Sequence, residues 1–148
     1  MKLTQAQAAG IAPWDQQVDE KTATMVYLDR YPCTPGHRLY VPKDNDNPNW
    51  VVRAFEDALA DGLHMVAVGE CDAFNIGYNS GEAAGQTVMY PHVHLIPRRW
   101  GDVQDPVGGV RNTIPGKGNY KKDIQQSSSR ITIIDTKEFH DSKTNIHT

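Results

Sequence analysis

The pattern of apolar and polar positions predicts one helix and four strands within the first hundred residues. Between residues 50 and 68 apolar side chains recur every three or four positions, which is typical of a helix packed on a sheet. These are Val51, Phe55, Ala58, Leu59, Leu63 and Val66. Shorter apolar runs bounded by turn residues predict strands at 25–29, 37–42, 73–79 and 88–96. We therefore expect an α+β fold, a mostly antiparallel sheet of about five strands with a long helix packed on it.

The N-terminal segment and the outer side of the predicted helix are less informative. Residues 1–22 are mixed and polar, and we expect Trp14 to anchor this segment to the body of the protein by its ring. Gly62 is expected to be a weak point of the helix, costing about 1 kcal/mol relative to alanine. The charged helix residues are expected to face solvent: Arg53, Glu56, Asp57 and Asp61.

Length and composition indicate one ordinary globular domain followed by an extension. The chain has 148 residues, of which 39% are hydrophobic and 22% are charged, and this is enough to bury one core. We expect residues 1–122 to form the domain. Residues 123–148 are expected to be a C-terminal extension with an additional strand at 131–134 and a flexible tail.

Charge and hydropathy exclude several classes of protein. The formal net charge is −3, so the chain lacks the broad basic surface of a protein that binds a nucleic-acid polymer. There is no signal peptide and no apolar run long enough to span a membrane, so we expect a cytoplasmic protein without membrane attachment. Cys33 and Cys71 are far apart in the sequence and are expected to be reduced thiols.

The predicted strand at 88–96 carries the candidate chemistry. Side chains two residues apart on a strand share a face, so Tyr90, His92 and His94 are expected to point the same way. Their neighbours Val93 and Leu95 are expected to point into the other layer. Two imidazoles on one face, entered through a Gly-Gln-Thr turn, make a compact surface that can face an anion. This arrangement indicates a functional site rather than a core.

The segment resembles the histidine triad family, whose signature is His-φ-His-φ-His-φ-φ (φ, apolar) preceded by Gly-Gln-Thr/Ser-Val. The second and third histidines are His92 and His94, and Tyr90 stands in place of the first. The resemblance implies that His92 is the nucleophile on the α-phosphorus of a nucleotide and that His94 donates to the phosphate or the leaving group. In relatives the first histidine supports the middle one by hydrogen bonds, and a Tyr90 phenol can donate such a bond.

Two earlier segments also match the family. The acid after the first strand binds the ribose hydroxyls in relatives, which implies this role for Asp29, since a carboxylate can accept from both hydroxyls. His37 is expected to support the site, or to be an ordinary packed histidine. The resemblance further implies that Asn79, Gln86 and Thr87 bind the nucleotide phosphate, with Gln86 positioning an oxygen or the attacking water.

The match covers roughly residues 24–120, and its last part resembles bacterial members related to diadenosine polyphosphate hydrolases. In that part, Arg98 and Arg111 could contact phosphates, or could be solvated or paired with Asp102 and Asp105. Both interpretations stay open on the sequence alone.

The resemblance implies a nucleotide hydrolase that acts on esters, anhydrides or amidates. A nucleotidyl-His92 intermediate would form and then be hydrolysed, releasing a nucleoside monophosphate. His94 favours hydrolysis over transfer, because the transferase branches carry glutamine there. The family also implies a homodimer, with the long helix or a sheet edge at the interface. No cofactor is required at the reacting centre, and no metal is expected, although a divalent cation bound with the substrate assists some relatives.

Two other functions are open on the sequence. His37, His92 and His94 could bind zinc through three imidazoles, although Asn79 and the Gly-Gln-Thr turn have no role in such a site. Alternatively, Tyr90 could mark a nucleotide-binding module or regulatory dimer that has lost activity. The sequence identifies neither the base nor the choice between P–O–P and P–N substrates.

Overall fold

The computed structural model describes residues 1–122, which fall into two separate compact units, Met1–Asp102 and the residues from Val103 onward. The strand and tail predicted within 123–148 lie outside the described residues. The second unit contains a short 3-10 helix, η2 (Gly109–Thr113). The first unit contains α1 (Leu3–Ala8), β1 (Gln17–Glu20), β2 (Thr24–Leu28), β3 (Arg38–Pro42), α2 (Asn49–Ala67), β4 (Ala73–Tyr78), the 3-10 helix η1 (Glu82–Ala84) and β5 (Val93–Arg98).

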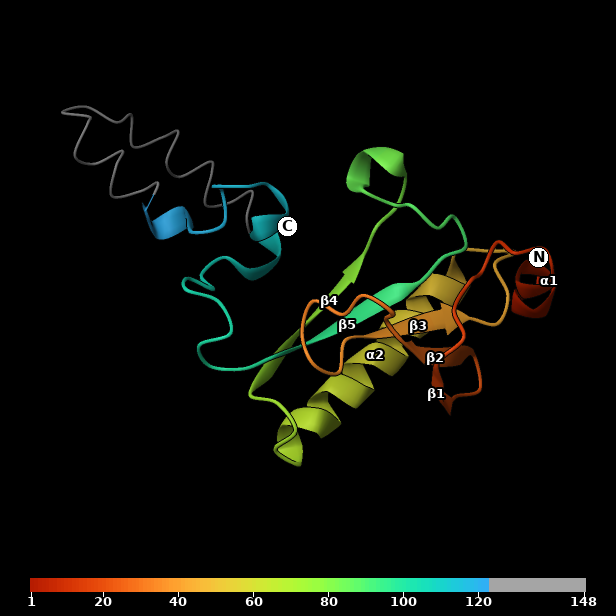
Figure 1. Ribbon diagram of the computed structural model, residues 1–148, viewed down its shortest axis with the longest axis horizontal. Helices are drawn as coiled ribbons and strands as arrows, with labels where there is room; N and C mark the ends of the chain where they lie inside the picture. The colour runs from red at the N-terminus through yellow and green to blue at the C-terminus, as the bar shows by residue number, and fades with distance from the viewer. Residues whose placement is uncertain (123–148) are drawn as a thin grey trace. The chain divides into compact units, whose positions relative to one another are not determined.

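The five strands form one antiparallel sheet in the order β1-β2-β3-β5-β4, and α2 runs across one face of it (Figure 1). The predicted α+β fold is therefore confirmed. Three strands, β2, β3 and β4, lie within a residue of their predicted bounds, and β5 overlaps its predicted range. β1 and α1 come from the N-terminal segment, for which neither was expected. β5 is an interior strand, and its His94 has Leu39 of β3 on one side and Gly77 of β4 on the other.

The strand that carries His94 begins at Val93, five residues later than predicted. Pro91 has no N–H to donate to a ladder. In addition, the side-chain amide of Gln86 donates to the backbone carbonyls of Val88 (3.1 Å) and Met89 (3.2 Å), so the local loop rather than a neighbouring strand satisfies these carbonyls. His92 consequently lies just before the ladder, in an irregular stretch of backbone.

α2 packs on the sheet through small residues rather than through the predicted stripe of large ones. Ala54, Ala58, Gly62 and Met65 are its buried positions. The prediction that the stripe packs on the sheet was wrong for three of its residues. Leu59, Leu63 and Val66 are 48%, 58% and 38% exposed. The helix carries apolar side chains on two sides, and small residues prevail at the contact because they let the helix backbone approach the strands closely.

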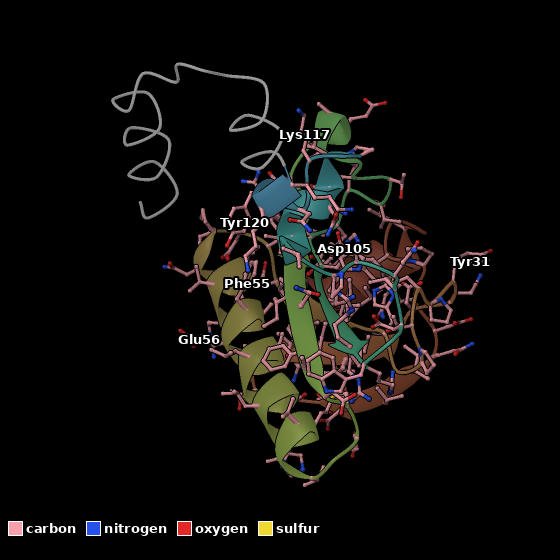
Figure 2. The ribbon with its side chains drawn as sticks, turned by 90° about the vertical axis from the view of Figure 1, so that its left-hand side faces the viewer. Tyr31, Phe55, Glu56, Asp105, Lys117 and Tyr120 are labelled. Atoms are coloured by element: carbon pink, nitrogen blue, oxygen red, sulfur yellow. The ribbon has the colours of Figure 1, made fainter. Side chains whose placement is uncertain are left out.

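Two carboxylates predicted to face solvent instead face the sheet. The Thr24 hydroxyl donates to Asp57 at 2.8 Å, and Asp61 accepts from Lys21 at 2.9 Å and from the Tyr40 phenol at 2.5 Å. Burial and the hydrogen bond to Asp61 both raise the pKa of Tyr40. Glu56 is exposed as predicted and lies on the outer side of α2 (Figure 2). Pairing these polar groups offsets their desolvation and ties α2 to β2 and β3.

Two apolar clusters lie on opposite faces of the sheet. One is under α2 and includes Val93 and Leu95. The other packs α1 against the opposite face, with Leu3, Ala6, Ala12, Tyr27, Leu39, Val41 and Tyr90. Because neighbouring residues of a strand point to opposite faces, His94 lies on the face away from α2. Among residues 1–122, no helix is both long and apolar enough to cross a membrane.

Replacing Gly62 by alanine should destabilise the protein, contrary to the expectation that this glycine is a weak point. A Cβ at this position would lie 2.7 Å from ring atoms of Phe74, well inside van der Waals contact. We expect Gly62→Ala to lower the free energy of unfolding by about 1–2 kcal/mol, because overpacking outweighs the better helix propensity of alanine. Chemical denaturation would measure this.

Gly77→Ala is the matched control, since a Cβ there meets nothing within 4 Å. Its effect on stability should stay within about 0.5 kcal/mol. The double variant Gly62→Ala/Phe74→Leu should recover part of the loss. A Gly62→Ala protein as stable as the wild type would show that Phe74 moves aside freely.

Candidate active site

Three histidines line up on the face of the sheet away from α2. His37 lies just before β3, His94 lies on β5, and His92 directly precedes β5. The ring centroids of His37 and His94 are 5.2 Å apart, and those of His94 and His92 are also 5.2 Å apart. The sheet therefore brings together residues from two distant segments of the chain, in the order His37, His94, His92.

A backbone carbonyl determines which nitrogen of the neutral His92 ring is unprotonated. His92 Nδ1 lies 2.9 Å from the carbonyl oxygen of Tyr90. A carbonyl only accepts, so Nδ1 carries the proton and donates it. In the neutral ring the lone pair then resides on Nε2. This is the protonation that a nucleophilic imidazole requires.

The hydrogen bonds of His37 and His94 also run in one direction. The backbone N–H of Cys33 donates to His37 Nδ1 at 3.2 Å, so the proton of the neutral ring is on Nε2. That Nε2–H donates to His94 Nδ1 at 2.9 Å. His94 in turn carries its proton on Nε2, which is buried and has no hydrogen-bond partner within residues 1–122. Within residues 1–122 the row thus ends in an unpaired donor next to the ring of His92.

Asp29 stands at the other end of the row. Its Oδ2 is 3.5 Å from His37 Nε2, and its Oδ1 accepts the backbone N–H of Tyr31 at 2.8 Å. The Tyr31 side chain is 84% exposed and projects outward (Figure 2). The carboxylate is therefore oriented by the loop after β2 and still has acceptor capacity, as an acid that binds two hydroxyls needs.

Burial lowers the pKa of all three imidazoles. For His94, burial together with the proximity of His92 and His37 lowers the pKa to about 4. For His92, burial outweighs the opposing effects of the Tyr90 carbonyl and Asp29, and for His37 it outweighs that of Asp29. All three rings are accordingly neutral at pH 7, in agreement with the protonation that the hydrogen bonds indicate.

The Tyr90 phenol does not support His92. It donates instead to the carbonyl of Pro42 at 2.7 Å and is buried in the cluster around α1. The support comes from the main-chain carbonyl of the same residue. The expectation that the phenol makes this bond was wrong, because the side chain at position 90 points into the apolar cluster.

The predicted phosphate-binding residues lie on the loop between β4 and β5. Gln86 is buried, and its Oε1 accepts the N–H of Gly81 at 2.8 Å while its amide nitrogen holds the carbonyls described above. In this structure it therefore closes the loop. Thr87 is exposed, and Asn79 is partly buried directly after β4. Contact of these residues with phosphate stays a prediction.

Arg98 and Arg111, whose contacts the sequence did not decide, both make hydrogen bonds within the protein. Arg98 makes two hydrogen bonds to Asp102, at 2.7 and 2.9 Å, and one to Asn75 at 2.8 Å. Arg111 donates to the carbonyl of Gly118 at 3.2 Å, within the second unit. The pairing of Arg98 with Asp102 is thus present, whereas Arg111 binds a carbonyl rather than Asp105.

The polarity of the hydrogen bonds disfavours a metal site. Ligand atoms of Asp29, His37 and His94 lie within 4.8 Å of one another. A ligating histidine usually donates its other ring N–H to an acceptor, but Nδ1 of His37 faces the N–H of Cys33. If Nε2 of His37 held a metal, two N–H groups would oppose each other. His92, which the zinc hypothesis requires, is not in this group.

Trp14 is a site residue whose position the sequence did not indicate. Its ring lies 4.8 Å from that of His92 and 6.5 Å from that of Tyr90, measured between centroids. The anchoring role expected of Trp14 does not specify which residues it contacts. No motif could have located it, because it comes from the N-terminal segment.

Comparison with known proteins identifies the family of the chain. Residues 15–101 match the model of the HIT domain family. The chain belongs to the HIT domain family. An uncharacterised HIT-like protein of Mycobacterium tuberculosis is 36% identical over 110 residues, which are 64% of this chain and 69% of that protein. A zinc-bound histidine triad protein of Mycobacterium smegmatis superimposes with a TM-score of 0.58 at 30% identity, covering 70% of this chain and 79% of that one.

Two HIT relatives are named as enzymes that act on nucleotides. Adenylylsulfatase of Arabidopsis thaliana is 34% identical over 87 residues, 54% of this chain and 44% of that protein. An asymmetrical bis(5'-nucleosyl)-tetraphosphatase of Schizosaccharomyces pombe is 30% identical over 100 residues, 63% of this chain and 55% of that protein. The chain thus spans about half the length of these two relatives.

Tyr90→Phe removes the hydroxyl of residue 90 and keeps its backbone carbonyl, so it distinguishes the roles of the two groups. Because the carbonyl orients His92, nucleotide turnover should stay within about threefold of wild type, whereas loss of the hydrogen bond to Pro42 should cost about 1 kcal/mol of stability. Steady-state kinetics and thermal unfolding measure the two effects. A loss of turnover larger than the loss of folded protein would show that the phenol itself acts in the site.

Proposed function

We propose that this HIT protein hydrolyses nucleotides at the α-phosphorus through a covalent nucleotidyl-His92 intermediate. The observation that supports it best is the hydrogen-bond direction at His92 and His94. One ring presents a lone pair on Nε2, and its neighbour presents a buried Nε2–H that has no hydrogen-bond partner among the described residues. A nucleophile beside a donor is what attack on a phosphoryl group requires. The named nucleotide enzymes among the relatives support the same reaction class.

In the proposed first step His92 Nε2 attacks phosphorus. The N–P bond forms as the bond from phosphorus to the leaving oxygen or nitrogen breaks. The His94 Nε2–H donates to the oxygen on which negative charge develops, or to the leaving group. Water then attacks phosphorus and loses one proton, which returns to His94 if that ring protonated the leaving group and otherwise passes to solvent. The N–P bond breaks with its electron pair staying on Nε2, so a nucleoside monophosphate is released and His92 is neutral again.

The remaining residues hold the substrate in this proposal. Asp29 accepts from the ribose hydroxyls with the oxygen that Tyr31 does not occupy. Asn79 and Thr87 donate to phosphate oxygens. Gln86 keeps the loop closed, and positions an oxygen or the attacking water if its amide turns away from the loop. His37 fixes the protonation of His94. No metal is required, although a divalent cation can accompany a polyphosphate substrate.

Within the family, we propose that the protein is closest in function to the diadenosine polyphosphate hydrolases. The support is the sequence resemblance of residues 98–120, whereas histidine rather than glutamine at position 94 supports only hydrolysis over transfer. Nucleoside phosphoramidates are the other substrate class. Both reactions use the same attack by His92, so they differ only in the leaving group.

Removing the nucleophile tests the proposal. A panel of dinucleoside polyphosphates, an adenosine phosphoramidate and a plain phosphomonoester would be incubated with wild type and His92→Asn, with and without Mg²⁺, and products separated by chromatography. We expect the wild type to release a nucleoside monophosphate and His92→Asn to be slower by on the order of 10³ to 10⁶.

His64→Asn is the matched control, because His64 is an exposed histidine of α2. It should leave turnover unchanged. Turnover that survives His92→Asn would eliminate the nucleophile assignment. Nucleotide binding without turnover of any substrate would instead identify a binding module.

We also propose a homodimer that forms through α2. The outer side of this helix exposes four apolar residues that recur along it: Val52, Leu59, Leu63 and Val66. β4 next to it is an end strand of the sheet, which agrees with an interface formed by the helix and a sheet edge.

Leu63→Glu should convert the dimer into a monomer, since a carboxylate would be buried at the interface. Light scattering after size-exclusion chromatography measures the mass. Ile11→Glu, at an exposed apolar residue outside α2, should leave the dimer intact. A wild-type monomer at high micromolar concentration would contradict the proposal.

A further inference from the structure

The indole of Trp14 covers one side of the candidate nucleophile. Its centroid lies 4.8 Å from that of the His92 ring, with the planes tilted by 55°. This distance is within the range in which aromatic rings are in direct contact. His94 lies at 5.2 Å from the same imidazole. The His92 ring is thus contacted by one ring of its own segment and by one ring from the N-terminal segment.

Trp14 is itself held firmly in place. It packs against Tyr27 at 6.4 Å and edge-on against Tyr90 at 6.5 Å. The residues after it are tied to β2 and the loop that follows: the Leu28 N–H donates to the Gln16 carbonyl at 2.9 Å, and Arg30 pairs with Asp15 at 2.8 Å. Ring contacts and the attachment of the two residues that follow Trp14 therefore both restrict the indole.

His92 depends on such contacts because the sheet does not hold it. It lies one residue before β5, outside the ladder that fixes His94. One hydrogen bond, from Nδ1 to the Tyr90 carbonyl, orients its ring. A single bond leaves rotation about the side chain only partly restricted, and a nucleophile has to be held within about 0.5 Å of its productive position.

We propose that Trp14 is a positioning residue for His92: its indole holds the imidazole in the orientation that donates Nδ1–H to Tyr90 and points Nε2 at phosphorus. This inference rests on the proposed role of His92 as nucleophile. It makes the N-terminal segment part of the catalytic arrangement, although none of its residues takes part in the chemistry.

Removing the indole has two consequences at His92. The ring gains rotational freedom, so a smaller fraction of molecules is ready for attack. The His92 ring also becomes more exposed to water, and hydration favours the charged imidazolium. The pKa of His92 therefore rises from its depressed value toward 6.5. The other groups near His92 are the Asp29 carboxylate, the His94 ring and the Tyr90 carbonyl. They are unchanged by the substitution.

The test compares Trp14→Ala and Trp14→Phe with Trp100→Ala, a control at an 89% exposed tryptophan of the same unit. For Trp14→Ala we expect kcat to fall about tenfold or more with KM changed less than about threefold. The acid limb of the kcat/KM profile should move to higher pH. Trp14→Phe should restore most of the kcat and most of the wild-type pH profile. Trp100→Ala should match the wild type in both measurements.

A second readout does not require turnover. The pKa of His92 can be followed from its ring Hε1 signal by NMR, assigned among the six histidines with His92→Asn. It should rise in Trp14→Ala and return in Trp14→Phe. If the wild type hydrolyses nothing, the proposed function fails while this comparison still decides whether Trp14 controls the His92 environment.

A folded Trp14→Ala protein with wild-type kcat and an unchanged His92 pKa would overturn the inference. If Trp14→Ala does not fold, Trp14→Leu replaces it, since leucine keeps apolar bulk for anchoring but lacks a flat ring against the imidazole. An equal loss of kcat in Trp14→Leu and Trp14→Phe, at unchanged His92 pKa, would likewise overturn it.

Discussion

The peptide N–H of Cys33 is the donor from which the histidine row takes its direction. It meets His37 Nδ1, so each following ring nitrogen has to alternate between acceptor and donor as far as His94 Nε2. The loop 30–36 provides this donor because its prolines and Gly36 turn the backbone back toward β3. If the direction were reversed, His94 would present a lone pair rather than an N–H, and it could not donate to a phosphate oxygen.

In the first unit, α2 packs on one face of the sheet, and the histidines of the candidate site lie on the other face. On one face, small residues let α2 approach closely, and Asp57 and Asp61 find partners on the strands. On the other face, α1 and its apolar cluster cover only the part of the sheet around Tyr27 and Val41. His94 lies on the same face, with Gly77 beside it on β4, where a Cβ would meet no atom of the described residues within 4 Å.

The sequence predicted the parts of the fold whose pattern is local. Strands β2, β3 and β4 and the helix at 49–67 were located to within a residue, whereas β5 begins five residues later than predicted. The residues named from the motif, Asp29, His37, His92 and His94, lie close together in the structure. Which side of α2 faces the sheet was not predictable, because large apolar residues occur on its outer side as well. The positions of Trp14 and of the Tyr90 phenol depend on how α1 and β1 pack, and the mixed N-terminal segment gave no sign of either element. The inward-facing amide of Gln86 depends on the shape of its loop.

The main-chain support of His92 also bears on how members of this family are recognised. The bond to His92 Nδ1 comes from a carbonyl that every amino acid possesses. Its geometry depends on the course of the backbone at residues 86–92, because the bond does not involve the side chain at position 90. A pattern that demands histidine there would pass over chains such as this one, although the hydrogen bond that orients the second histidine is present. The backbone path between the glutamine and the second histidine is then a better marker of how that ring is oriented than the number of histidines in the motif.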